Sequence, residues 1–261
     1  MTDFRKGMIR DRLRLVERVL LVLSGKGGVG KSVVSATMAA LLAQDRLRVG
    51  LLDTDVYGPS SAVLLQARSR PREGKHGLIP PVREGVKLMS VDLFAPGQPI
   101  PLTGHGAMQV VLEMLALTDW GRLDYLIVDM PPSTGDIMMT LTSLERGRLE
   151  AIVVTTPDRL STTVAHRALQ LLLGERIPVA GVLGNMCRPK GDGSMSSRGP
   201  ERLAKEFGLP LLGELPYDAK VSAAVSSGGM EELVQTRFAR ALLLSMRRHM
   251  NSQQTPGRRA G

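Results

Sequence analysis

The sequence predicts an α/β fold in which helices cover both faces of an open, mostly parallel β-sheet. Short, largely apolar runs alternate along the chain with longer segments of helical periodicity, and a glycine-rich turn joins the first run to the first helical segment. Runs without polar–apolar alternation are typical of strands buried on both faces, and strands alternating with helices imply right-handed crossovers. The 261 residues suffice for one domain of this kind.

The expected strands are six largely apolar runs: Val19–Leu23, Val49–Leu52, Val86–Met89, Tyr125–Val128, Ala151–Val154 and Val179–Leu183. The expected helices are the periodic segments Ser32–Gln44, Met108–Leu117, Thr162–Leu173, Glu201–Phe207 and Met230–Arg248. Two segments rich in glycine with proline or serine, Gln66–Gly85 and Arg188–Pro200, are expected to be irregular. We therefore assign residues 18–250 to one domain, residues 1–17 to an irregular basic extension and residues 251–261 to a flexible basic tail.

The composition excludes several classes of protein. A single cysteine forms no internal disulfide, which argues against a disulfide-stapled secreted scaffold and favours the cytoplasm. No apolar run approaches the ~18 residues that span a bilayer. The formal charge is +9, and six arginines without any acid follow from Arg237 onward. Without interleaved aromatic residues, this tail favours a terminal helix over a nucleic-acid or membrane site, although binding of the tail to a membrane stays open.

The glycine-rich turn matches the P-loop pattern G-x-x-x-x-G-K-[ST], since it reads Gly25, Lys26, Gly27, Gly28, Val29, Gly30, Lys31 and Ser32. It follows the first expected strand and begins the first expected helix, which is the context that a P-loop requires. Main-chain N–H groups of such a loop surround the phosphates of a nucleotide, and the helix N-terminus adds a partial positive charge. We expect Lys31 to contact the β- and γ-phosphates of ATP and Ser32 to bind Mg²⁺.

Three carboxylates follow expected strands. Asp53 and Asp55 come after Val49–Leu52, and Asp129 comes directly after Tyr125–Val128, as in a Walker B strand. The carboxyl ends of parallel strands face the ligand crevice of an open sheet. One carboxylate is expected to bind Mg²⁺ and another to orient the attacking water. The alternative for Asp53 and Asp55 is a pair of turn caps without chemistry.

Several segments together resemble the Mrp/ApbC branch of the MinD–ParA ATPases, which have a deviant Walker A motif. The resemblance covers roughly residues 18–230 and is carried by Leu23–Ser32, Asp53–Ser60, Trp120–Asp136, Thr155–Pro157, Gly184–Met186 and Leu212–Pro216. It implies a slow, homodimeric ATPase that carries iron–sulfur clusters in the cytoplasm. Its partners would be iron–sulfur assembly proteins or apoprotein clients.

The same resemblance implies roles for individual residues. Lys26 would reach across the dimer to the nucleotide of the partner, and Asp55 would orient the hydrolytic water. The remaining implied contacts are those with Mg²⁺ and with the base: Asp53 and Asp129 near the metal, Asn185 hydrogen-bonded to adenine, and Pro216 beside it.

The sequence departs from this family at its cysteines. Cluster carriers of the family have a Cys-x-x-Cys shortly after the Asn-Met pair, whereas Cys187 is the only cysteine of this chain. A dimer would then supply two thiolates, while a cluster normally uses four cysteine ligands. Cys187 is either a bridging cluster ligand or an incidental buried thiol. The alternative function is therefore a cluster-free, ATP-dependent dimerisation switch that recruits a protein, a membrane or DNA.

Overall fold

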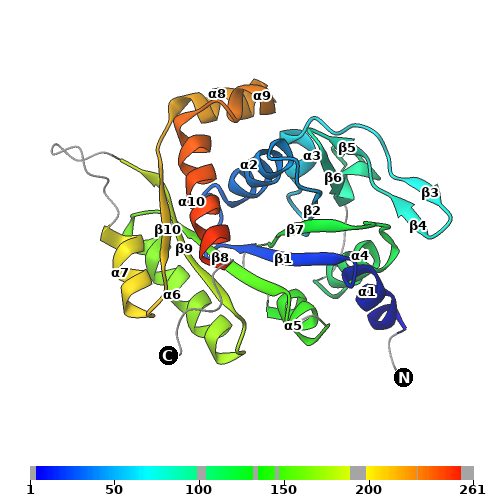
Figure 1. The fold of residues 1–261 in the computed structure, drawn as a ribbon, viewed down its shortest axis with the longest axis horizontal. Helices are drawn as coiled ribbons and strands as arrows, with labels where there is room; N and C mark the ends of the chain where they lie inside the picture. The colour runs from blue at the N-terminus through cyan, green and yellow to red at the C-terminus, as the bar shows by residue number, and fades with distance from the viewer. Residues whose placement is uncertain are drawn as a thin grey trace.

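The computed structural model describes residues 4–98, 104–131, 135–144, 147–188, 198–227 and 229–253. An eight-stranded sheet forms the centre of the molecule, in the order β10-β9-β8-β1-β7-β2-β6-β5, with helices on both faces (Figure 1). All its pairings are parallel except that of β5 with β6. The predicted fold class is confirmed.

The strands of this sheet are β1 (Val16–Leu23), β2 (Val49–Asp53), β5 (Val82–Arg83), β6 (Val86–Met89), β7 (Leu123–Asp129), β8 (Leu149–Thr155), β9 (Val179–Cys187) and β10 (Leu211–Pro216). A separate hairpin consists of β3 (Arg72–Gly74) and β4 (Gly77–Ile79). The helices are α1 (Arg5–Leu13), α2 (Lys31–Gln44), α3 (Ser61–Leu64), α4 (Gly104–Leu117), α5 (Gly135–Leu144), α6 (Arg159–Gly174), α7 (Arg198–Glu206), α8 (Ala219–Ser227), α9 (Met230–Leu233) and α10 (Arg237–Gln253), with a 3₁₀ turn at Val91–Leu93.

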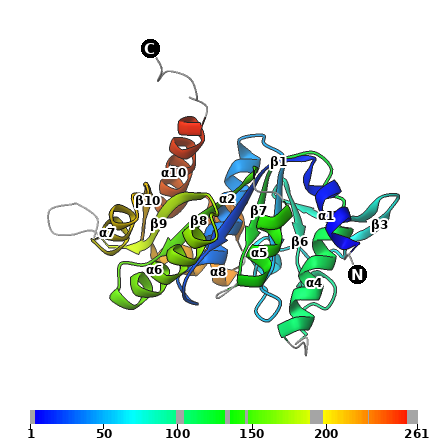
Figure 2. The ribbon, with the colours of Figure 1, turned by 90° about the horizontal axis from the view of Figure 1, so that it is seen from below.

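Each face of the sheet has its own hydrophobic core. Helices α1, α4, α5, α6 and α7 pack on one face, and α2, α3, α8, α9 and α10 pack on the other (Figures 1 and 2). Alternate residues of β1 enter the two cores, Leu21 on the first side and Leu20 and Val22 on the second. Burial of both faces explains why the strands are continuous apolar runs, and all six predicted strands are present.

The N-terminal segment differs from the expected irregular extension. Residues Arg5–Leu13 form α1, whose Ile9 and Leu13 are buried in the core beneath α4. These two residues are four positions apart and therefore share one face of the helix. The remainder of α1 is mostly charged, so the segment lacks the apolar stripe that marks a packed helix in sequence.

The bounds of other elements also differ from those expected from the sequence. The segment Gln66–Gly85 contains β3, β4 and β5, and most of Arg188–Pro200 lies outside the described residues. The single helix predicted for Met230–Arg248 is divided into α9 and α10, because the Thr236 hydroxyl accepts a hydrogen bond from Ala239 N and begins a new helix. Residues 254–261 of the expected tail are outside the described part. In the parts of the chain that the structure describes, no helix is long and apolar enough to cross a membrane.

The strand order determines where the loops meet. Strand β7 lies between β1 and β2, and Asp53 at the end of β2 is in register with Asp129 at the end of β7. The glycine-rich turn after β1 and the loops after β2 and β7 therefore lie at the same edge of the sheet. Strands β8, β9 and β10 end at this edge too, since all of them run parallel to β1.

Candidate functional site

The glycine-rich turn connects β1 to α2 at the carboxyl edge of the sheet. Gly28 and Gly30 have φ angles of +79° and +81°, which residues with a side chain rarely adopt. At Gly25, a Cβ would lie 2.5 Å from the Val164 carbonyl carbon of α6, so a larger residue would push this helix away. Helix α2 begins at Lys31, directly after Gly30, and its first N–H groups face the loop. The turn thus has the backbone geometry of a P-loop, which we call the cradle; its binding of phosphate stays a prediction.

A buried ion pair lies beneath this cradle. Lys31 Nζ is 2.5 Å from Asp129 Oδ1 and donates a hydrogen bond to Ser32 Oγ at 3.2 Å. Ser35 Oγ donates a second bond to Asp129 Oδ1 at 2.8 Å. The Asp129 side chain is fully buried, and that of Lys31 is 8% exposed. The structure therefore brings together the lysine of the P-loop and the carboxylate at the end of β7.

The second oxygen of Asp129 is the atom through which this residue would contact a hydrated Mg²⁺ ion. Asp129 Oδ2 is buried and has no hydrogen-bond partner among the described residues. A buried acceptor without a donor is unfavourable, and a water molecule of a Mg²⁺ hydration shell would satisfy it. Lys31 Nζ donates hydrogen bonds to both Asp129 Oδ1 and Ser32 Oγ, so Ser32 lies close to Asp129. The donor set thus fits Mg²⁺, with Ser32 and Asp129 as the residues that would hold it.

Asp53 is used mainly to hold the loop that follows β2. Its Oδ1 accepts a bond from Asp55 N at 3.1 Å, and its Oδ2 accepts bonds from Ser60 N and Ser61 N, both at 3.0 Å. Burial raises the pKa of Asp53 to about 6, and the neighbouring Asp129 charge adds to this shift. Because backbone N–H groups occupy both oxygens, Asp53 positions the loop; a role for it near Mg²⁺ stays a prediction.

Asp55 lies on this loop, close to the edge of the sheet. Its Oδ1 accepts a bond from Gly58 N at 3.1 Å. The preceding Thr54 ties the loop to β7, since its N and Oγ1 donate to the Asp129 carbonyl at 3.1 and 2.7 Å. The carboxylate of Asp55 is partly exposed and not buried in the core. A role for Asp55 in orienting water stays a prediction.

Asn185 and Pro216 lie together beside the cradle, as predicted. They line a small cavity of about 60 Å³, together with Gly30, Val33 and Tyr217. Asn185 is buried, and its Nδ2 donates a bond to the Val29 carbonyl of the P-loop at 2.8 Å. Asn185 thereby braces the loop; the hydrogen bond to adenine remains a prediction.

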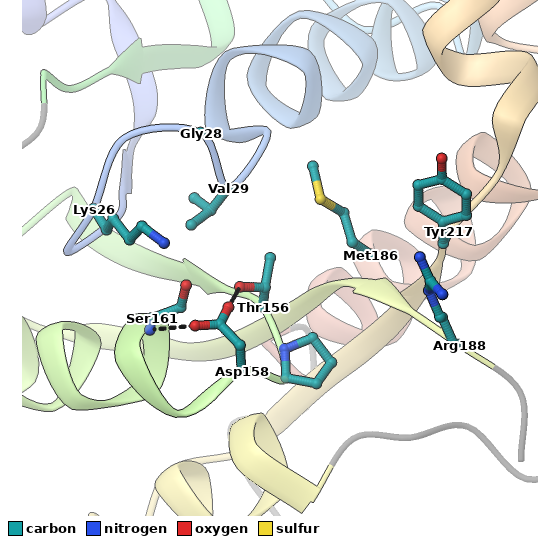
Figure 3. Close-up of a pocket in the computed structure, with 10 residues that line it drawn as sticks. Lys26, Gly28, Val29, Thr156, Asp158, Ser161, Met186, Arg188 and Tyr217 are labelled. Carbon is teal, nitrogen blue, oxygen red and sulfur yellow. Dashed lines mark hydrogen bonds between the residues drawn. The ribbon is translucent and has the colours of Figure 1, made fainter.

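A larger cavity of about 400 Å³ lies next to the P-loop (Figure 3). Lys26 is exposed on the loop side of this cavity, with Gly28 and Val29. It is also lined by residues to which the sequence assigned no role in the site: Thr156, Asp158, Ser161, Met186, Arg188 and Tyr217. They follow the carboxyl ends of β8, β9 and β10, so the strand pattern together with the P-loop could have identified these loops.

Two contacts organise the far side of this cavity. The Thr156 hydroxyl and Ser161 N, the latter at 2.9 Å, donate to Asp158 and lower its pKa to about 2. Asp158 thereby caps α6 as a carboxylate. The Arg188 guanidinium lies 5.1 Å from the centre of the Tyr217 ring, a cation–π contact. The cavity thus has an anionic group near Lys26 and an aromatic surface near Pro216.

Cys187 does not fit an iron–sulfur cluster in this conformation. Its side chain is fully buried at the end of β9, and burial raises the pKa of the thiol to about 12, with a smaller contribution from Glu214. In the described ranges, no group of three or more His, Cys, Asp or Glu residues is placed to hold a metal ion. A cluster needs several thiolates, and this chain has one protonated thiol.

Comparisons with known proteins point to one family. The family model for ParA, described as NUBPL iron-transfer P-loop NTPase, matches residues 15–247. A chloroplastic Fe-S cluster assembly factor of Arabidopsis thaliana is 36% identical over 232 residues, which cover 86% of this chain and 43% of that protein. An iron-sulfur cluster carrier protein of Deinococcus radiodurans is 38% identical over 222 residues, covering 82% of this chain and 63% of the relative. This chain thus spans less than two thirds of the length of both relatives.

Solved structures give the same fold. A nucleotide-binding protein from Archaeoglobus fulgidus, in complex with ADP, is 28% identical with a TM-score of 0.74, over 90% of this chain and 95% of that one. The cell division ATPase MinD of Pyrococcus furiosus has a TM-score of 0.65 at 18% identity, over 91% of this chain and 99% of its own. At this identity, the likeness to MinD concerns the fold alone.

Proposed function

Because this chain belongs to the ParA family of NUBPL-type iron-transfer P-loop NTPases, we propose that it is a Mg²⁺-dependent ATPase that acts as a homodimer in iron–sulfur protein assembly. The observation that carries this proposal is the buried Lys31–Asp129 pair beneath the glycine turn, with one Asp129 oxygen left without a hydrogen-bond donor. The arrangement supplies a cation for phosphates and a carboxylate for a hydrated Mg²⁺.

The proposed reaction is transfer of the γ-phosphoryl group of ATP to water. The water oxygen forms a bond to the γ-phosphorus while the bond to the bridging β-oxygen breaks, and ADP leaves. In this proposal Asp55 orients the water, and Lys31 neutralises charge on the β- and γ-phosphates. Mg²⁺, when bound, would shield the charge that develops between these phosphates. Positioning and charge stabilisation suffice for this chemistry, and no covalent nucleophile is required.

We assign the adenosine part of the nucleotide to the cavities beside the P-loop. The larger cavity, about 400 Å³, and the smaller one share Met186 and Tyr217. Asn185 and Pro216 line the smaller cavity. The ADP complex of the Archaeoglobus fulgidus protein supports a nucleotide in this fold.

The iron–sulfur part of the proposal is a role in handing over clusters with help from a partner. A dimer would provide only two Cys187 thiols, both buried. Cluster ligands would therefore have to come mainly from the partner protein. The burial of the single cysteine, Cys187, also favours the second candidate function, a cluster-free ATP-dependent switch.

Two substitutions test the ATPase assignment. We expect Lys31→Ala to abolish binding of a fluorescent ATP analogue, because the cation that faces the phosphates is removed. We expect Asp55→Ala to keep this binding while kcat falls about 100-fold or more, since misplacing a reacting group can cost about that much. Steady-state release of phosphate measures kcat, and Lys75→Ala and Asp11→Ala are matched controls at exposed positions.

Either of two results would overturn these assignments. Unchanged ATP affinity in Lys31→Ala would remove the phosphate site, and normal turnover in Asp55→Ala would remove the role of that carboxylate. Since Lys31→Ala leaves Asp129 without its cation, Ser32→Ala provides a second variant that keeps the ion pair. It is expected to weaken the dependence of turnover on Mg²⁺, and an unchanged dependence would exclude Ser32 as a ligand.

A further inference from the structure

A second, larger cavity lies outside the nucleotide site, between α6 and α7. It has a volume of about 740 Å³, and α6 and α7 lie side by side in both ribbon views (Figures 1 and 2). Its charged and titratable lining residues are Arg159, His166, Arg167, Arg198, Arg202 and Glu206. We call this cavity, with these six residues, the arginine groove. Its chemistry is not used by the proposed ATPase.

Helix periodicity explains how the arginines come together. Arg159, Thr163 and Arg167 are four residues apart on α6, as are Arg198, Arg202 and Glu206 on α7, so each set shares one helix face. The opposite faces are anchored in the core by Leu169 and Leu172 of α6 and by Ala204 of α7.

A close approach of the two helices closes one end of the groove. At Gly199 a Cβ would lie 2.7 Å from Thr162 Cγ2 and 2.8 Å from the Pro157 carbonyl oxygen. Glycine therefore permits α7 to begin against the first turn of α6. This contact places Arg198 and Arg159, one from each helix start, on the same cavity.

The groove carries an excess of positive charge. Among the described residues that line it, Glu206 is the only carboxylate, and its Oε1 is already 3.0 Å from His166 Nε2. Within the described ranges, no carboxylate oxygen lies within 4.0 Å of the guanidinium groups of Arg159, Arg167, Arg198 or Arg202. Arg159 and Arg198 also stand in the first turns of their helices, where the helix dipole disfavours cations. The local cost of this arrangement is offset when an anion binds.

We propose that the arginine groove binds an acidic segment of a partner protein. Its lining on α6 runs from Arg159 to Gln170, which corresponds to about 16 Å of helix. An extended peptide of about five residues covers this distance. Arginine forks bind carboxylates through two parallel hydrogen bonds, so aspartate and glutamate side chains are suitable ligands.

Nucleic acid fits the groove less well. Of the described residues that line it, His166 alone has an aromatic ring. That ring is already in edge contact with Phe207, with ring centres 4.8 Å apart, and its Nε2 is 3.0 Å from Glu206 Oε1. A concave site between two helices also cannot enter the major groove of DNA as a protruding helix does. The same Pro157 lines both this groove and the cavity beside the P-loop, so a bound segment would contact the turn that leads from the nucleotide side into α6.

Binding of a labelled peptide to the full chain tests this proposal. The probe is a fluorescein-labelled decapeptide of alternating glutamate and alanine, titrated by fluorescence anisotropy at low and at moderate salt. The double variant Arg167→Glu with Arg202→Glu is expected to bind at least about tenfold more weakly than wild type, because it reverses charges on both walls. Affinity of the wild type should fall as salt is raised, since exposed charges are screened.

The control is Arg240→Glu with Arg248→Glu, which makes the same change of charge at exposed positions of α10. It is expected to bind the peptide as wild type does. If the charge reversals disturb folding, as judged by circular dichroism and by thermal unfolding, Arg167→Gln with Arg202→Gln replaces them with the same expectation. Peptide affinity of the groove variant equal to that of wild type would overturn the proposal, as would no binding at millimolar concentration. Groove-dependent binding of a short DNA duplex in place of the peptide would overturn it too.

Discussion

At the scale of single residues, two neighbouring carboxylates in the core are stabilised in different ways. Asp129 is compensated by the ammonium group of Lys31 and the hydroxyl of Ser35, whereas Asp53 accepts bonds from three backbone N–H groups. Burying a carboxylate costs several kcal/mol unless such groups compensate it. Among the described residues, Lys31 is therefore the cation that faces Asp129, while backbone N–H groups stabilise Asp53.

This arrangement predicts an unusual dependence of stability on pH. The pKa of Asp53 is about 6 in the folded chain, against 3.8 for the ordinary carboxyl group, because burial and the Asp129 charge favour the neutral form. Between these values the folded state binds more protons than the unfolded state. The contribution of Asp53 to the free energy of unfolding is therefore largest at low pH and is lost as pH rises from about 4 to about 6.

Urea unfolding of the nucleotide-free protein across this pH range measures the effect. We expect Asp53→Asn to remove the part of the pH slope that comes from Asp53, whereas Asp11→Asn, at an exposed position of α1, should leave the slope unchanged. Identical slopes for wild type and Asp53→Asn would show that Asp53 titrates normally.

Cys187 allows a second prediction at this scale. Since its thiol is buried and its pKa is raised to about 12, we expect a disulfide reagent at pH 8 to react at least about 100-fold more slowly with native protein than with protein in urea. We also expect the chain alone to stay colourless after anaerobic incubation with iron and sulfide. Rapid native labelling, or a brown product that Cys187→Ser abolishes, would instead make Cys187 a cluster ligand.

At the scale of elements, the sequence identified those strands and helices whose pattern follows from burial. Strands β1, β7 and β8 are buried on both faces and were visible as apolar runs. The edge strand β10, which contains Gly213 and ends in Pro216, has no such run and was missed. Helix α1 was missed because only Ile9 and Leu13 face the core and the rest of the helix is mostly charged.

Helix α1 can be tested as a part of the core. Leu13 is 1% exposed and packs beneath α4, so Leu13→Ala is expected to lower the free energy of unfolding by about 2–4 kcal/mol. Leu15→Ala is the matched control, because the side chain of Leu15 is 41% exposed. Urea unfolding gives both values. An equally small effect of the two substitutions would show that the N-terminal segment does not contribute to the core.

At the scale of the whole molecule, strand order explains both what the sequence revealed about the site and what it missed. The P-loop and its acids carry recognisable spacing, and the order β1-β7-β2 brings them together. Asp158, Arg188 and Tyr217 belong to no motif of this kind. They join the site only because β8, β9 and β10 end at the same edge, which is a property of the folded sheet.

Lys26 connects this edge to the proposed dimer. Its side chain is exposed and lines the larger cavity, whereas Lys31 is buried beneath the loop, so the two lysines cannot have the same role. A partner subunit that approaches this edge would meet Lys26 first. We therefore expect association of two chains to depend on ATP and on Lys26.

Sedimentation velocity of the full chain carrying Asp55→Ala, in Mg·ATP and in Mg·ADP, tests this account most directly. We expect a dimer in ATP and a monomer in ADP, with the ATP dimer weakened when Lys26→Ala is added and retained when Lys75→Ala is added in its place. The same sedimentation coefficient in both nucleotides, or an ATP dimer that persists without Lys26, would contradict it.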